Sequence, residues 1–402
     1  MVGGLQHETH RAQDAAQQSG LDSAKQSPQV SAPAIQGRTA RRRRHSADRR
    51  NRGLGIGGMV HHNRGRDGAR PSNKSAPTRV WGDMDAPSPF SLPVLPYLRL
   101  RVTLRAEEPA ELPPYQGSLL RGAFGHALRR LVCVAGPRQP CATCRLRRGC
   151  HYTRLFETFI EGPPPPFLRG LDTAPRPYVF EPDVTHLGRG APRYAPGDPL
   201  GFDLLLFGQA TELAGWVLLA VERMATAGLG ARRARFALDR VEAGAVVLCE
   251  AGRWTGRDVP PPSLPSRTVP PGERVTLRLQ TPLRLQKHGG LATGFSVRDL
   301  AFPMLRRVLE LATFHGTGPA PDWTLRPLLE HAGTVRAVAT ELRWFDWERY
   351  SNRQERTMNF GGLLGRVELE GDLAPLAALL RTAEIVHVGK GATFGLGKVE
   401  LE

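Results

Sequence analysis

Hydrophobic and polar residues alternate along Tyr97–Leu104, where Leu or Val takes every second position and Arg or Thr fills the positions between. A period of two is typical of a strand with one buried face. Helical and strand-like runs then follow one another, and Ser118 stands where it can cap the first helix. The elements predicted after the first strand are a helix at Leu119–Val132, a strand at Phe202–Phe207, a helix at Glu212–Ala227 and a strand at Phe236–Val241.

The second part of the chain repeats this order. The tetrapeptide Val-Thr-Leu-Arg occurs at residues 102–105 and again at residues 275–278, and a glycine loop closes each copy, at Gly228–Gly230 and at Gly389–Gly397. Strand–helix–strand–strand–helix–strand is the order of a ferredoxin-like domain, so we predict an α+β fold with two such domains in tandem. The elements predicted in the second copy are strands at Val275–Leu279, Val335–Trp347, Gly365–Glu370 and Lys398–Leu401, and helices at Val297–Ala312 and Leu373–Ala383.

Domain boundaries follow from composition. The first ferredoxin-like domain is predicted at residues 96–250 and contains a cysteine-rich insertion at 133–150, and the second is predicted at residues 273–402. Arg257–Gly272 contains six prolines and almost no apolar residues. We therefore interpret residues 251–272 as a proline-rich linker.

Residues 1–83 form a basic tail of different composition. They contain 15 Lys and Arg against 6 Asp and Glu, and few apolar residues. Such a segment cannot bury enough apolar surface to offset its ordering entropy, so we predict that it is disordered. It could be a nucleic-acid-binding arm, a targeting peptide, or the product of a start codon placed too far upstream. We favour the last interpretation, because Met84 directly precedes the first segment with a folded pattern.

The net charge of +17 favours a polyanionic partner. The sequence has no apolar stretch near the roughly 18–20 residues that cross a bilayer, and no charged-then-apolar secretory leader. We expect a cytoplasmic protein without a membrane partner.

Four of the five cysteines lie within 18 residues, at Cys133, Cys141, Cys144 and Cys150. Disulfides are rare in cytoplasmic proteins, and a Cys-x-x-Cys pair suits a tetrahedral metal. We predict a structural zinc site made of four thiolates, with an iron–sulfur cluster as the alternative. Buried or redox-reactive thiols would be the simpler explanation.

The two glycine loops each stand between a helix and a following strand, which is the reverse of the order in a mononucleotide P-loop. Glycines let the backbone approach a ligand closely, and exposed N–H groups can bind phosphate oxygens. Arginines flank the first loop and lysines flank the second. This combination favours an extended phosphodiester backbone over a single nucleotide, although either loop alone could be a structural turn.

The loop Gly391–Lys398 at the end of two ferredoxin-like domains resembles the RAMP superfamily of CRISPR-associated RNA-binding proteins. Within that superfamily the chain resembles the pre-crRNA-processing endoribonucleases, the Cas-six family. The resemblance runs from about Pro96 to Glu402 and is strongest in the C-terminal domain. The segments that carry it are Leu120–Arg129, the Cys-x-x-Cys insertion leading into Leu155-Phe156-Glu157, Arg349–Gln354 and His387–Lys390.

The resemblance implies metal-independent cleavage of CRISPR repeat RNA, in which a 2′-hydroxyl attacks the adjacent phosphate and leaves a 2′,3′-cyclic phosphate. Such a reaction needs groups that transfer protons and cations that stabilise the developing charge. His126 in the first helix is the predicted catalytic residue, because the pKa of histidine is near neutral, and Tyr115 and His387 are the alternatives. The predicted RNA-binding residues are Arg121, Arg129, Arg130, Arg232, Arg233, Arg235, Arg349, Arg353, Lys390, Gly391, Gly395, Gly397 and Lys398.

Two other functions fit the same residues. A non-catalytic RAMP subunit that binds crRNA among the subunits of a CRISPR effector complex would share the fold and the charge. A zinc-dependent nuclease is a more distant alternative, and cleavage that resists EDTA would exclude it.

Overall fold

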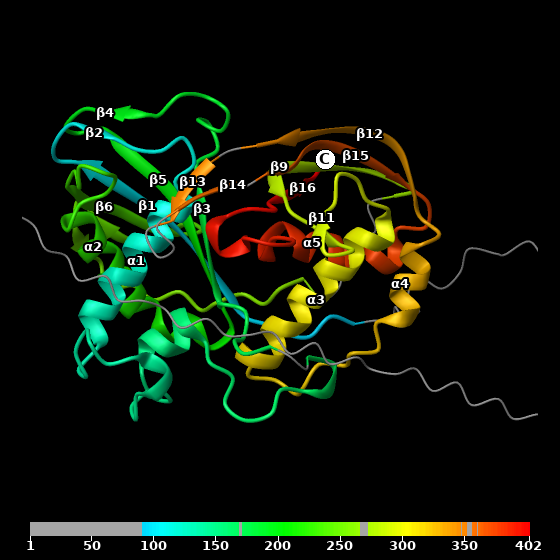
Figure 1. The fold of residues 1–402 in the computed structure, drawn as a ribbon, viewed down its shortest axis with the longest axis horizontal. Helices are drawn as coiled ribbons and strands as arrows, with labels where there is room; N and C mark the ends of the chain where they lie inside the picture. The colour runs from blue at the N-terminus through cyan, green and yellow to red at the C-terminus, as the bar shows by residue number, and fades with distance from the viewer. Residues whose placement is uncertain (1–90, 169–170, 266–271, 347, 352–355, 360) are drawn as a thin grey trace, which may run out of the picture. The chain divides into compact units, whose positions relative to one another are not determined.

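The fold is built from two antiparallel sheets, each covered by helices on one face (Figure 1). The computed structural model describes residues 91–168, 171–265, 272–346, 348–351, 356–359 and 361–402. Residues 1–83 lie outside the described residues, so the expectation of a disordered tail stays a prediction.

The first sheet has the strand order β3-β5-β1-β6-β7-β8. Its helices follow the predicted pattern, α1 between the first two core strands and α2 before β6. A short pair of strands, β2 (Ala110–Glu111) and β4 (Arg193–Tyr194), stands beside the sheet. The main elements are β1 (Tyr97–Ala106), α1 (Gly117–Val132), β3 (Tyr178–Pro182), β5 (Pro199–Phe207), α2 (Ala214–Thr226), β6 (Phe236–Ala243), β7 (Val246–Glu250) and β8 (Arg253–Trp254).

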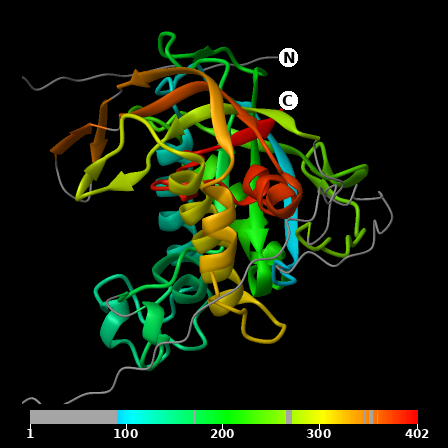
Figure 2. The same cartoon turned by 90° about the vertical axis from the view of Figure 1, so that its right-hand side faces the viewer.

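The second sheet has the strand order β12-β15-β9-β16, and Figure 2 shows its helices together on one side of it. Two hairpins, β10–β11 and β13–β14, extend from this domain. The elements are β9 (Arg274–Leu283), β10 (Gln286–Lys287), β11 (Gly290–Leu291), α3 (Val297–His315), α4 (Arg326–Ala332), β12 (Arg336–Phe345), β13 (Glu348–Ser351), β14 (Arg356–Asn359), β15 (Gly362–Glu370), α5 (Ala377–Val386) and β16 (Val399–Leu401).

Both sheets therefore place their core strands in the same order, with the third strand beside the first and the first beside the last. This is the arrangement of a ferredoxin-like domain, and it confirms the predicted tandem fold. The two Val-Thr-Leu-Arg copies fall on β1 and β9, the equivalent central strands. In each copy the Val and Leu side chains are buried and the Arg side chain is exposed.

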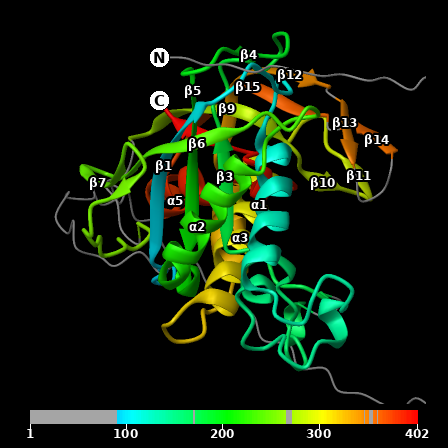
Figure 3. The same cartoon turned by 90° about the vertical axis from the view of Figure 1, so that its left-hand side faces the viewer.

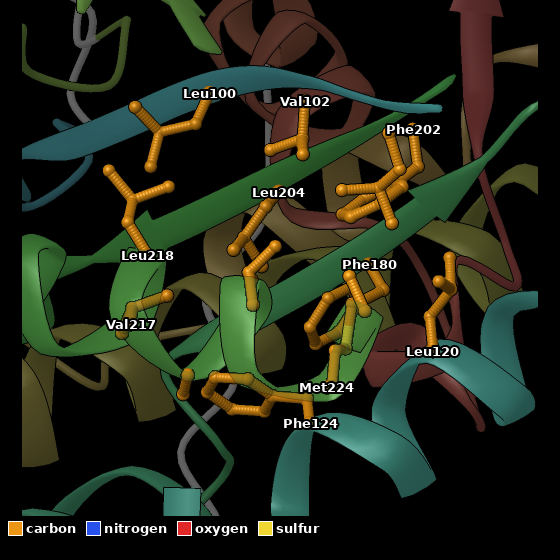
Figure 4. Close-up of a cluster of buried hydrophobic side chains, with 14 of the residues drawn as sticks. Leu100, Val102, Leu120, Phe124, Phe180, Phe202, Leu204, Val217, Leu218 and Met224 are labelled. Carbon is orange, nitrogen blue, oxygen red and sulfur yellow. The ribbon is translucent and has the colours of Figure 1, made fainter. Parts of the chain in front are cut away.

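The core of the first domain lies between the sheet and its two helices (Figure 4). Leu120 and Phe124 stand one turn apart on α1 and are completely buried. They meet Phe180 and Phe202 from the sheet, where the rings of Phe124 and Phe180 lie 5.3 Å apart between centroids. The sequence therefore buries the α1 stripe that its helical period predicts.

The opposite face of the first sheet is not left to solvent. Val179, Leu205 and Phe207 point away from the first core and belong to the second, together with residues of α3 and α5. The two domains thus share one apolar interior at their contact.

The predicted linker is only partly a linker. Residues 251 and 252 form the turn between β7 and β8, and the segment beyond it runs beside the start of the folded chain, where Leu264 N donates to Leu95 O at 2.9 Å. Leu264 is buried in the second core and Thr382 donates to the carbonyl of Pro265. Prolines here do not exclude packing, because an extended chain can still bury a single leucine.

Within the described residues, the structure has no helix that is both long and apolar enough to cross a membrane.

Candidate RNA-processing site

The second glycine loop begins where α5 ends. His387 closes the helix with a φ of 62°, and a single 3₁₀ turn, Ala392–Phe394, follows between Gly391 and Gly395, whose φ angles are 87° and 82°. These left-handed conformations suit glycine because it has no Cβ. The chain therefore turns sharply at each end of this 3₁₀ turn.

This loop packs against the first domain. The hydroxyl of Tyr115 donates to the carbonyl of Phe394 at 2.6 Å. A Cβ on Gly117, at the start of α1, would overlap the same carbonyl, and a Cβ on Gly395 would lie 2.5 Å from the carbonyl of Phe180. Two glycines thus permit α1, β3 and the loop to touch.

A buried carboxylate lies beneath the loop. Glu181 on β3 is 3% exposed and accepts hydrogen bonds from His387 Nε2, Lys398 Nζ and Arg99, each at 2.8 Å. Arg99 also donates to Asp203 at 2.9 Å. Burial alone would raise the pKa of Glu181, but the hydrogen bond and charge of His387, with the charges of Arg99 and Lys398, hold it well below its usual range. Glu181 therefore joins the two domains as a charged centre.

The two alternative catalytic residues, Tyr115 and His387, are part of this buried contact. His387 is fully buried, and its Nδ1 faces the carbonyl of Leu396 at 3.1 Å. Burial and the charge of Glu181 raise the pKa of Tyr115 well above its usual value. Both side chains hold the loop in place, and neither faces a surface that RNA could reach.

His126 occupies a different position. It lies on the exposed face of α1 that also carries Arg130, and a Cβ on Gly122, one turn earlier, would meet nothing within 4 Å. It stands nine residues from Gly117, about 14 Å along the helix axis at 1.5 Å per residue. Figure 3 shows α1 on the same side of the molecule as the β10–β11 and β13–β14 hairpins.

Several predicted RNA-binding arginines hold the structure together. The guanidinium of Arg121 lies 4.3 Å from the centre of the Phe156 ring, in the segment after the insertion, and 5.2 Å from that of Phe394 in the glycine loop. Arg129 donates to the carbonyls of Pro137 and Gln139, at 3.1 and 2.9 Å. Their charges are committed to contacts within the protein.

The first glycine loop packs beside the segment that leads into α1, since a Cβ on Gly230 would lie 3.0 Å from Leu112. Arg232, Arg233 and Arg235 are exposed in this loop, and Arg235 lies 3.7 Å from Glu108.

In the second loop, Lys390 is exposed, whereas Lys398 is bonded to Glu181. Gly395 and Gly397 are buried, Gly391 is half-buried, and Gly397 N donates to the carbonyl of Pro282 at 3.1 Å. The glycine loop that we predicted to bind phosphates is therefore largely buried in the protein.

The segment Arg349–Gln354 is described only in part. The backbone of Arg349 lies in β13, and Arg353 lies outside the described residues. Before the hairpin, the guanidinium of Arg343 lies 5.6 Å from the centre of the Phe345 ring, and Trp344 is partly exposed.

A hollow of ≈ 470 Å³ lies between the domains. Leu187 of the first domain faces the helix-free side of the second sheet, where Arg278, Arg343 and Arg366 line the hollow with Glu341. Leu187 also packs against Tyr115 and the glycine loop. The hollow therefore adjoins the loop contact and is more basic than acidic.

The structure gives no support for the predicted four-thiolate metal site. Among the described residues, no group of three or more His, Cys, Asp or Glu side chains is placed to hold a metal ion. All four cysteines of the insertion are half-buried, and Cys141 and Cys150 pack against the first core. Hydrogen bonds from Arg129 and packing against the first core hold the insertion in place.

Glu181 is the residue that the sequence analysis missed. It stands in Tyr178–Pro182, a strand whose five residues are all buried and which shows no alternation. The available signal was a single carboxylate within an otherwise apolar run.

Residues 277–399 match the family model of the CRISPR-associated endoribonuclease Cas6. Residues 95–258 match the AF_1859_N model, which describes an N-terminal domain. The C-terminal domain of the chain thus belongs to the Cas6 family, as the sequence resemblance indicated. No curated protein matches the chain significantly.

Several solved structures match the chain over most of its length, each with a TM-score below 0.5. Cas6 from Thermus thermophilus is 15% identical with a TM-score of 0.43, over 77% of this chain and 99% of that one. The product of a Cas6-related gene from Pyrococcus furiosus is 10% identical with a TM-score of 0.39, over 76% of this chain and 98% of that one. A partial Cas6-RT-Cas1–Cas2 complex is 14% identical with a TM-score of 0.47, over 78% of this chain and 46% of that one.

Proposed function

We propose that this protein binds CRISPR repeat RNA and cleaves it with His126 as a proton-transfer group. The observation that carries the proposal is the position of His126, which is exposed on α1 beside Arg130, while Tyr115 and His387 are buried. The membership of the C-terminal domain in an endoribonuclease family supports it.

The chemistry follows from what these side chains can do. A 2′-hydroxyl attacks the neighbouring phosphorus, the P–O5′ bond breaks, and a 2′,3′-cyclic phosphate and a 5′-hydroxyl result. His126 transfers a proton to or from the reacting oxygens, and Arg130 stabilises the negative charge that develops on the phosphate. The exposed cations of the glycine loops, Arg232, Arg233 and Lys390, would bind the RNA backbone.

The test compares His126→Ala with His288→Asn, a control at an exposed histidine of the β10–β11 turn. Single-turnover cleavage of repeat RNA at saturating protein should fall about 10²- to 10⁴-fold in H126A, the range of a general acid or base. Binding of the same RNA should change little. Equal rates in wild type and H126A would refute the assignment. EDTA should leave the wild-type rate unchanged, because no step uses a metal.

A non-catalytic subunit that binds crRNA with other effector subunits is the second candidate. The observation that favours it is the burial of the other two titratable candidates, which leaves His126 without either of them beside it. In that case the wild-type protein would bind repeat RNA and leave it uncut at every pH.

A further inference from the structure

A second pocket lies where the cysteine-rich insertion meets the end of α3. Figure 3 shows the insertion at the C-terminal end of α1. Its volume is ≈ 410 Å³. Residues 158–161, which follow the insertion, form one wall, the 3₁₀ turn Gly208–Leu213 another, and the last residues of α3 a third. A Cβ on Gly208 would overlap the carbonyl of His315, so a glycine lets the turn reach the helix end.

Three arginines line this pocket, against a single carboxylate. Arg147 and Arg148 both donate to Glu161, through Nε at 2.9 and 3.1 Å. Arg154 donates to Gln209 at 3.5 Å. An arginine has five N–H donors, so the contacts that the described residues make leave several donors of Arg148 and Arg154 for a ligand. The pocket is suited to an anion.

His315 adds no charge to the pocket. Its Nε2 donates to the carbonyl of Pro175 at 2.6 Å, and burial lowers its pKa to about 4, with the charges of Arg307 and Arg154 acting in the same direction. At neutral pH it is an uncharged ring at the pocket wall. The positive potential therefore comes from the arginines.

Aromatic rings complete the surface. Phe159 and Phe314 line the pocket. At its edge, Phe167 stacks on Trp323 with ring centroids 4.3 Å apart, and Trp323 Nε1 donates to Thr313, a residue of the pocket wall. Phe167 is 54% exposed. An exposed aromatic ring, here Phe167 backed by the half-buried Trp323, beside arginines is the combination that binds unpaired bases and their phosphates.

We propose that this pocket and the Phe167–Trp323 pair bind a single-stranded RNA segment. Arg148 and Arg154 would contact its phosphates and Phe167 would stack on a base. The inference extends the proposed function, since it assumes an RNA substrate, but it concerns a separate surface. The 16 residues of α1 span about 24 Å, so a segment bound here would flank the RNA that reacts near His126.

A single-stranded RNA decamer of unrelated sequence is the probe, because it tests the pocket without repeat recognition. The variants are Arg148→Ala, Arg154→Ala and Phe167→Ala, with Arg257→Ala, an exposed arginine after β8, as the charge-matched control. Fluorescence anisotropy should show at least about fivefold weaker binding for Phe167→Ala, the scale of one stacked base. Each pocket arginine variant should lower the salt dependence, log K against log salt, by about 0.7. Glu161→Gln should tighten binding, because it releases Arg147 and Arg148.

Repeat-RNA cleavage is measured on the same variants to separate the two proposals. If the decamer binds wild type and the pocket variants equally, or does not bind wild type, the pocket inference is overturned, whatever the cleavage result. If decamer binding depends on the pocket but repeat RNA is neither bound nor cut, the proposed function fails and the single-strand site stands. An acidic protein partner in place of RNA would show as absent decamer binding.

Discussion

Glu181→Gln should destabilise the protein by removing the charge at the domain contact. The carboxylate is buried and accepts hydrogen bonds from Arg99, Lys398 and His387. Breaking a fully buried ion pair costs about 3–5 kcal/mol. The side chains of Arg99 and Lys398 are 36% and 28% exposed and can return to water, whereas that of His387 is 0% exposed and cannot. Since glutamine keeps one acceptor, we expect a loss of about 2–4 kcal/mol in the free energy of unfolding.

Thermal unfolding measures this effect. At about 2–4 °C per kcal/mol, the scale for domains of roughly 150–250 residues, the melting temperature should fall by roughly 4–16 °C. Asp203→Asn is the matched control, because Asp203 pairs with Arg99 and Arg101 at the edge of the same cluster and is partly exposed. Its loss should stay below about 1 kcal/mol.

The pH dependence of stability gives a second test of the role of Glu181. The pKa of Glu181 is lowered in the folded state, so its stabilisation is complete above the unfolded pKa of about 4.3 and is lost as pH falls through the folded pKa. The difference between wild type and E181Q should therefore shrink as the solution becomes more acidic than about pH 4. A variant that melts with the wild type at pH 7, or a difference that grows in acid, would refute the reasoning.

Three further predictions concern other parts of the fold. Gly117→Ala should lower the melting temperature because its Cβ would overlap the glycine loop, whereas Gly122→Ala, in open space on the same helix, should stabilise the protein by about 0.5–1 kcal/mol. Cys144→Ser should change stability by no more than about 0.5 kcal/mol, and elemental analysis should find far less than one zinc per chain; one zinc would restore the four-thiolate site. His315 is buried and its pKa is lowered to about 4, so the unfolded chain takes up the proton first as the pH falls. Wild type should therefore lose stability between about pH 6.5 and 4, and His315→Gln should remove that loss. A wild-type urea midpoint that stays constant across this range would contradict the prediction.

The fold was predictable where a strand is half-buried. Alternation located β1 and the repeated tetrapeptide located β9; each strand has one face on a core and one face toward solvent or ion pairs. Alternation failed for β3, since both faces of that strand are buried, one in each core. The order of elements in the first domain could be predicted without β3 only because the second copy shows the complete order of strands and helices.

The site was predictable in residue type but not in role. The glycine loop was found from its composition, yet its glycines serve contact between domains, which no local pattern reveals. His126 was found on the helix that carries it, and the structure leaves it exposed. The spacing of the cysteines is compatible with a metal site, but it does not determine whether the four sulfurs lie close enough together to bind one ion. That depends on how the insertion packs.

The shared interior has a consequence for how this molecule can move and be divided. Val179, Leu205 and Phe207 come from the first sheet but fill the interior of the second domain. A fragment of residues 273–402 would lack these side chains and expose an apolar surface to water. The two duplicated halves are therefore expected to unfold together, in a single calorimetric transition.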